Sequence, residues 1–188
     1  MHLTIAAIAL ATSSVLALPA VYNTLPTTST FPDTPCPWTD EVPLSHDEVI
    51  ANWYKLWAGD YSLLDKTVMP DIQLWQDRFP TGNGSAPLPI GNSEQFLGFV
   101  KSSRIGFEVY KFIDDFHFGV GNMIALRWTL DATFAGSETA TLEPGSHVAY
   151  NGTDICLLDP CSGRMSQVLS AQDLITYFHI VGTPIGIV

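Results

Sequence analysis

The residues of this chain that could do chemistry are single carboxylates and histidines rather than parts of a known catalytic motif. The sequence has no Gly-x-Ser-x-Gly elbow or phosphate-binding loop, and Gly119-Val120-Gly121 lacks the third glycine and following helix of a dinucleotide fingerprint. It has no Cys-x-x-Cys pair or close His/Cys cluster, so we expect no structural zinc site. What remains is proton transfer by an Asp or a His, without a cofactor.

Two regions could supply such a group from a strand. Residues 71–77 alternate with a period of two, which predicts a polar and aromatic face that carries Trp75 and Asp77. His117 could act as a base beside Asp115 or Asp154. A lone histidine between two phenylalanines is equally typical of an exposed strand surface, so both interpretations of His117 stay open.

Length and composition limit the class of protein. The 188 residues are 46% apolar and 14% charged, which is typical of a folded protein with one domain and shorter appendages. Nineteen acidic against eight basic residues give a net charge of −11. Phosphate backbones and anionic membrane surfaces would repel such a chain, so we expect no nucleic-acid or membrane partner.

The first 20 residues predict export. A short apolar stretch, a polar break and small residues at Ala17 and Ala20 are typical of a secretory signal, the alternative being an amphipathic first helix. We therefore expect a signal peptide at 1–17, a Pro-rich extended arm at 18–43, a folded domain at 44–182 and a short tail at 183–188. We expect a secreted, extracellular protein.

Secretion would permit disulfides and glycans. Cys36 in the arm could pair with Cys161 in a turn; a local bridge from Cys156 to Cys161 and three free thiols are the alternatives. Asn83 and Asn151 each begin an Asn-Gly-Ser/Thr glycosylation acceptor. Asn83 is the better candidate because its surroundings indicate a loop.

The periodicity predicts helices first and strands afterwards. Ser45 and Glu48 have capping-box spacing, and a helix with one apolar face follows as far as Gly59. A second helix is expected from Asn92 to Gly106. Strand-like stretches then cover residues 107–113, 116–118, 123–134, 146–158 and 164–169, and a helical turn closes the domain at 172–179. This order predicts an α+β domain in which a curved, mostly antiparallel sheet wraps around N-terminal helices to form a cone.

Many large aromatic residues fall on the predicted inner surface, so the cone is either filled or holds an apolar ligand. We expect Tyr54 to position that ligand, and we expect the ligand-contacting walls to include Trp57, Trp75, Tyr110, Trp128 and Tyr150.

Several short stretches in this order resemble the SnoaL-like branch of the nuclear transport factor 2-like superfamily, from about Ser45 to Gly182. The stretches are Trp53-Tyr54, Gly59-Asp60, Met69-Pro70-Asp71, Ile90-Gly91, 125–129, Pro144-Gly145, 148–150, 152–155, 162–165 and Gln172-Asp173-Leu174. The resemblance implies a cone-shaped α+β fold and a homodimer formed through the convex face of the sheet. It says little about chemistry, because this fold hosts cyclases, isomerases, dehydratases, epoxide hydrolases and non-catalytic binders.

The resemblance also points to Asp154. In cyclase members it implies a catalytic carboxylate three residues before Asp173, where this chain has Ser170, and a partner histidine at the position of Asp154. A serine without a neighbouring base cannot move a proton near neutral pH. Asp154 would lie among aromatic rings that raise its pKa toward a useful range. The alternative is a structural carboxylate bonded to backbone or to Arg127.

Related epoxide hydrolases need an Arg-x-Asp on the long strand, and this chain reads Arg127-Trp128-Thr129, which disfavours that chemistry. Two hypotheses therefore remain for a secreted SnoaL-like protein. The first is cofactor-independent isomerisation, cyclisation or dehydration of a small apolar or polyketide-like molecule, with Asp154, Asp77 and His117 as the candidate catalytic residues. The second is a non-catalytic extracellular protein that binds a small ligand or a partner.

Overall fold

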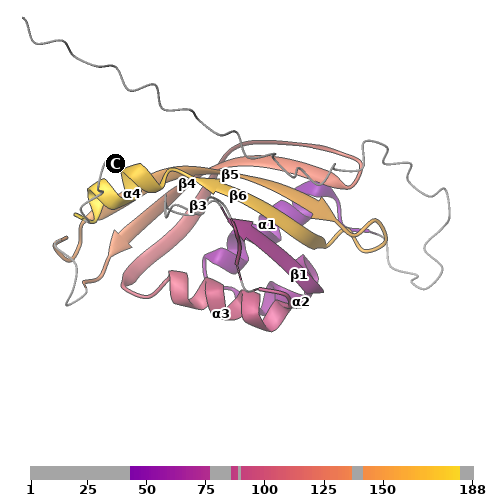
Figure 1. Ribbon diagram of the computed structural model, residues 1–188, viewed down its shortest axis with the longest axis horizontal. Coiled ribbons are helices and arrows are strands. Elements are labelled where there is room, and N and C mark those ends of the chain that lie inside the picture. The colour runs from indigo at the N-terminus through magenta and orange to yellow at the C-terminus, as the bar shows by residue number, and fades with distance from the viewer. Residues whose placement is uncertain (1–42, 77–85, 89, 137–141, 183–188) are drawn as a thin grey trace, which may run out of the picture. The chain divides into compact units, whose positions relative to one another are not determined.

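Three helices precede most of the sheet in the computed structural model, which describes residues 43–76, 86–88, 90–136 and 142–182 (Figure 1). α1 spans His46–Trp57, the 3-10 turn η1 spans Tyr61–Leu63, α2 spans Leu64–Thr67 and α3 spans Ser93–Ser103. The Ser45 hydroxyl accepts from the backbone N–H of Glu48, and the Glu48 carboxylate accepts from the backbone N–H of Ser45 at 2.9 Å. The predicted capping box is confirmed.

Six strands form one mixed sheet in the order β2-β1-β6-β5-β4-β3. Their bounds are β1 Val68–Gln76, β2 Ala86–Pro87, β3 Phe107–Val120, β4 Met123–Phe134, β5 His147–Leu158 and β6 Met165–Gln172. β1 runs parallel to β6, and the other neighbours are antiparallel. The expected α+β class with a curved, mostly antiparallel sheet is confirmed.

The core lies between one face of the sheet and the helices α1 to α3, which lie together on that face in Figure 1. Strand alternation decides which side chains join it: Leu126, Trp128 and Leu130 of β4 are buried, whereas Arg127 and Thr129 point to the other face. α1 contributes its apolar side, which includes Trp53 and Trp57. The short helix α4, Leu174–Ile180, follows β6, and Asp173 caps it.

β3 corrects one expectation, because the stretches 107–113 and 116–118 form a single strand. Its register against β4 shifts between Asp114 and Phe116, so that Asp114 pairs with Trp128 and Phe116 with Arg127. Such a bulge inserts one residue and reverses the alternation beyond it. Phe116 therefore points to the outer face of the sheet, whereas Asp114 belongs to the inner one.

No helix in the described part of the chain is long and apolar enough to cross a bilayer. The predicted signal peptide, the tail at 183–188 and nearly all of the arm lie outside the described residues.

Candidate active site

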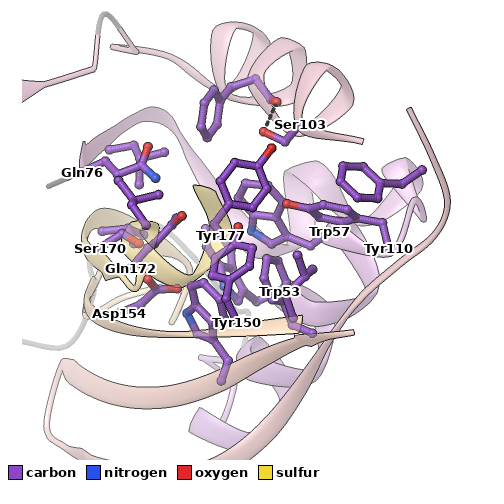
Figure 2. A pocket seen from close by; sticks show the side chains of 18 residues that line it. Trp53, Trp57, Gln76, Ser103, Tyr110, Tyr150, Asp154, Ser170, Gln172 and Tyr177 are labelled. Atoms are coloured by element: carbon purple, nitrogen blue, oxygen red, sulfur yellow. Dashed lines mark hydrogen bonds between the residues drawn. The ribbon is translucent and has the colours of Figure 1, made fainter. Parts of the chain in front are cut away.

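A cavity of about 180 Å³ lies between the inner face of the sheet and the helices (Figure 2). Most of its wall is aromatic or aliphatic, and a smaller part is polar. The side chains that line it are Trp53, Trp57, Leu74, Gln76, Phe99, Ser103, Phe107, Tyr110, Phe112, Trp128, Leu130, Tyr150, Asp154, Val168, Ser170, Gln172, Leu174 and Tyr177.

Gln76, Ser170 and Asp154 form a polar row across three strands of the inner face. The register pairs Gln76 of β1 with Ser170 of β6, and Ser170 with Asp154 of β5. Paired residues of adjacent strands point to the same face of a sheet, so all three side chains reach the cavity wall. Figure 2 shows them together with Gln172 at one end of the cavity.

Asp154 is the carboxylate of this site. It is 4% exposed, and burial raises the pKa of its carboxyl from 3.8 to about 6. Interactions with the Ser170 hydroxyl and the indole N–H groups of Trp128 and Trp53 act in the opposite direction and keep the pKa from rising further. The Oδ1 atom of Asp154 is buried and has no hydrogen-bond partner among the described residues. A carboxyl with this pKa can accept or donate a proton near neutral pH.

A glycine lets Trp128 lie close to Asp154. Trp128 of β4 pairs with Gly152 of β5, and a Cβ atom at position 152 would overlap the indole ring. The missing side chain therefore leaves the space that the ring occupies against the neighbouring strand. The Trp128 ring also packs against Phe112, with 4.5 Å between the ring centroids.

Trp57, the last residue of α1, forms the other end of the cavity. Arg104 fixes this end, because its Nη1 donates to the backbone carbonyls of Trp57 at 2.7 Å and of Tyr110 at 2.9 Å. The indole ring meets Phe112 edge to face at 5.4 Å between centroids. The Nε1 atom of Trp57 is buried and has no hydrogen-bond partner among the described residues.

Three tyrosines complete the wall. Burial raises the pKa of Tyr110, Tyr150 and Tyr177, and a hydrogen bond links the hydroxyls of Tyr110 and Tyr150. These hydroxyls therefore stay protonated, so they can orient a polar group but cannot serve as bases near neutral pH.

The structure brings together five of the residues that the sequence indicated: Asp154, Trp57, Tyr110, Trp128 and Tyr150. Trp75 is a correction. It is 38% exposed on the outer face of β1, and its neighbour Gln76 lines the cavity instead. The period of two was correct, but β1 pairs with β6 such that its aliphatic face points inward.

Tyr54 and His117 lie outside the cavity wall. The Tyr54 hydroxyl donates to Asp114 Oδ1 at 3.3 Å. His117 Nδ1 lies 2.6 Å from Asp114 Oδ2, and its Nε2 lies 3.2 Å from Asp47 Oδ1 on α1. The hydrogen bond with Asp114 raises the pKa of His117 most, and the contact with Asp47 adds to it. This histidine therefore ties β3 to α1, and neither Asp115 nor Asp154 is its partner.

The remaining expected site residues lie outside the cavity or outside the described residues. Asp77, Asn83 and Cys36 lie outside the described residues. Cys156 is a free, buried thiol on β5, so the local bridge to Cys161 does not form, while the pairing of Cys36 with Cys161 stays a prediction. Asn151 lies within β5, where its Oδ1 accepts from the Thr129 hydroxyl at 2.8 Å.

Sequence reasoning missed Gln76, Ser103, Gln172 and Tyr177 as lining residues. Gln76 has the same parity as the buried Ile72 and could have been found once the inner face of β1 was known. Nothing in the local pattern indicates Ser103 or Tyr177, because helix packing brings them to the cavity.

The structure gives no support to epoxide hydrolysis. Arg127 and Thr129 point to the outer face of the sheet, where Arg127 Nη1 donates to the Thr153 hydroxyl at 3.1 Å. Asp131, on the same face, is held by Lys111 at 3.0 Å and by His147 at 2.9 Å. Within the described ranges, no three His, Cys, Asp or Glu side chains are close enough to hold a metal ion.

No protein-family model and no curated protein matches this sequence. Solved structures do match. IdmH from Streptomyces antibioticus, a candidate polyketide cyclase, has a TM-score of 0.60 at 17% identity, over 72% of this chain and 97% of its own. A candidate SnoaL-like polyketide cyclase from Jannaschia sp. CCS1 has a TM-score of 0.58 at 15% identity, over 79% of this chain and 100% of its own.

A protein from Catenulispora acidiphila with a ketosteroid isomerase-like fold, in complex with trimethylamine, has a TM-score of 0.57 at 13% identity, over 74% of this chain and 96% of its own. At such low identity the structural match shows the fold alone, and the chemistry has to be argued from the residues of this chain. The chain therefore has the α+β fold of SnoaL-like proteins.

Proposed function

We propose that this protein binds a small, mainly apolar molecule in the cavity and that Asp154 moves a proton on it without a cofactor. The single observation that carries the proposal is the buried carboxyl of Asp154 at the cavity wall, where burial raises its pKa to about 6. Its neutral surroundings include no basic side chain among the residues that line the cavity. Buried structural carboxylates normally have a cationic partner, so one that only hydroxyl and indole groups contact beside a cavity supports a role in chemistry.

The reaction class follows from these groups. Asp154 as carboxylate would accept a proton from a carbon next to a carbonyl, and the electron pair of the C–H bond would move onto the carbonyl oxygen. The same carboxyl would then return the proton to another atom of the substrate, which completes an isomerisation, or assist ring closure or loss of water. Hydroxyls of Tyr110 and Tyr150 are available to orient the substrate.

Turnover of activated ketones by the wild type and by Asp154→Asn tests this proposal. We expect rates that rise with pH to a plateau above about pH 6, and a loss of at least about 100-fold in the variant. An unchanged rate in the variant would remove Asp154 from the mechanism.

A non-catalytic small-ligand carrier is the second candidate. Ser170 favours it, because this residue stands opposite Asp154 where the family resemblance implies a carboxylate. A ligand that binds tightly and is recovered unchanged, with no turnover across a broad panel, would select the carrier.

We further propose secretion, a Cys36–Cys161 disulfide, glycans at Asn83 and Asn151, and a homodimer. The outer face of the sheet supports the dimer, because its register aligns an apolar row: Trp75, Leu169, Ile155, Ala125 and Phe118. Phe118 is 61% exposed in this row. Light scattering tests the dimer, and mass spectrometry of protein from the culture medium tests cleavage, disulfide and glycans.

A further inference from the structure

Two buried polar atoms without partners among the described residues belong to the same cavity. They are Trp57 Nε1 and Asp154 Oδ1, and both residues line the cavity. The exposed fractions of the two residues are 7% and 4%. An indole N–H can only donate a hydrogen bond, whereas a carboxylate oxygen accepts one. Native proteins rarely leave such groups unpaired, so a pair of opposite type in one cavity indicates a ligand with matching groups.

The two residues lie toward opposite ends of the cavity. Figure 2 shows Asp154 beside Gln76, Ser170 and Gln172 at one end, and Trp57 with Tyr110 at the other. Aromatic rings separate them, since Trp53 interacts with Asp154 and also contacts Trp57 at 5.8 Å between ring centroids. Aromatic side chains therefore lie between the two polar groups.

The volume limits what fits between these ends. A cavity of about 180 Å³ is only slightly larger than the roughly 150 Å³ cavity that holds benzene in another protein. One substituted ring fills such a space, whereas a fused multi-ring molecule would extend beyond it. Rings on the wall, such as Trp128 and Phe112, suit the faces and edges of a planar ligand.

We propose that the ligand is a single-ring hydroxyaryl ketone or a cyclic hydroxy-enone of similar size, with a carbonyl at one end and a hydroxyl at the other. The carbonyl accepts a hydrogen bond from Trp57 Nε1, and the hydroxyl donates to Asp154 Oδ1. This inference rests on the cavity being the ligand site, as proposed above, but it does not require that the protein is an enzyme.

Four probes of nearly equal shape separate the two contacts. para-Hydroxyacetophenone carries both groups, para-methylacetophenone only the carbonyl, para-ethylphenol only the hydroxyl, and para-ethyltoluene neither. Calorimetry at pH 7.5 should give about tenfold tighter binding for the first probe than for either single-group probe, as one buried hydrogen bond implies.

Variants assign each preference to its atom. Trp57→Phe should abolish the preference for the carbonyl and keep that for the hydroxyl, and Asp154→Leu should do the reverse. Trp75→Phe is the matched control, because it makes the same change on the outer face and should alter neither preference. Replacing Trp57 by benzothienylalanine, which has sulfur in place of the N–H group, removes the donor without changing the ring shape.

The outcomes are distinguishable. Equal affinity for all four probes, or preferences that survive both cavity variants, would overturn this proposal while leaving the cavity as a ligand site. No binding of any probe to the wild type would overturn the ligand site as well.

Discussion

Replacing Asp154 with Asn should remove a pH dependence of stability that the wild type shows between about pH 4 and pH 7. Burial raises the pKa of this carboxyl from 3.8 to about 6 in the folded protein. Below pH 3.8 the group is protonated in both the folded and the unfolded chain, so burial costs little there. As pH rises through the folded pKa, the unfolded chain releases the proton more readily, and the free energy of unfolding falls.

The two pKa values set the magnitude. A pKa change of one corresponds to about 1.4 kcal/mol, so the rise from 3.8 to about 6 costs about 3 kcal/mol above pH 7. Asn has nearly the same shape and carries no charge. The variant should therefore gain about 2.5 kcal/mol relative to the wild type between pH 4 and pH 7.5.

Urea denaturation followed by tryptophan fluorescence, at pH values from 4 to 8, measures this difference. Asp131→Asn is the matched control on the outer face, where Lys111 and His147 lower the pKa of the carboxyl. The sign is opposite for this residue: its contribution to stability is present at neutral pH and is lost as pH falls. If the difference in the free energy of unfolding between the wild type and Asp154→Asn stays constant with pH, the buried carboxyl does not have a raised pKa and the reasoning is refuted.

Three further predictions concern the support of the site. Gly152→Ala should lower the free energy of unfolding by about 1–3 kcal/mol, because the new methyl group overlaps Trp128; chemical denaturation measures the loss. Arg104→Met should cost about 1–3 kcal/mol in the same assay, because it removes the donor to the buried end of α1 at Trp57. His117→Gln should lower the melting temperature more at pH 6 than at pH 9, because a raised histidine pKa stabilises the fold below 6.5 and the effect is lost as pH rises through the folded pKa.

Each of these predictions has a control on the same chain. Gly98→Ala adds a methyl group in open space on α3 and should not destabilise the protein. Arg164→Met removes an exposed bond to the carbonyl of Asp65 and should cost less than Arg104→Met. His179→Gln is the control for His117→Gln, because His179 forms no ion pair with a carboxylate in the described part of the chain. Equal effects in variant and control would contradict the reasoning.

Local patterns were sufficient for much of the fold. Ser45 and Glu48 indicated where α1 begins, and the alternation along β4 and β5 indicated that Trp128, Tyr150 and Asp154 share the inner face. These predictions succeed because capping and strand parity depend on neighbours within a few residues. The expected order of helices and strands followed from the change in periodicity along the chain.

The first strand shows where local patterns fail. Its two faces both mix polar and apolar residues, so the sequence alone does not say whether Trp75 or Gln76 points inward. The parallel pairing with β6, almost 100 residues later in the chain, decides the matter. The partners of His117 could not be predicted from the local sequence either, because they depend on a bulge in β3 and on the position of α1.

The sequence by itself determined the class of fold and the presence of an inward carboxylate, because alternation and capping are local properties of the chain. Only the tertiary structure decided that Trp53 and Trp128 cover Asp154 and that its Oδ1 and Trp57 Nε1 lack protein partners within the described residues. Burial and hydrogen bonding arise from segments that are far apart in sequence. The pKa of Asp154 and the polarity of the cavity are therefore properties of the packed structure.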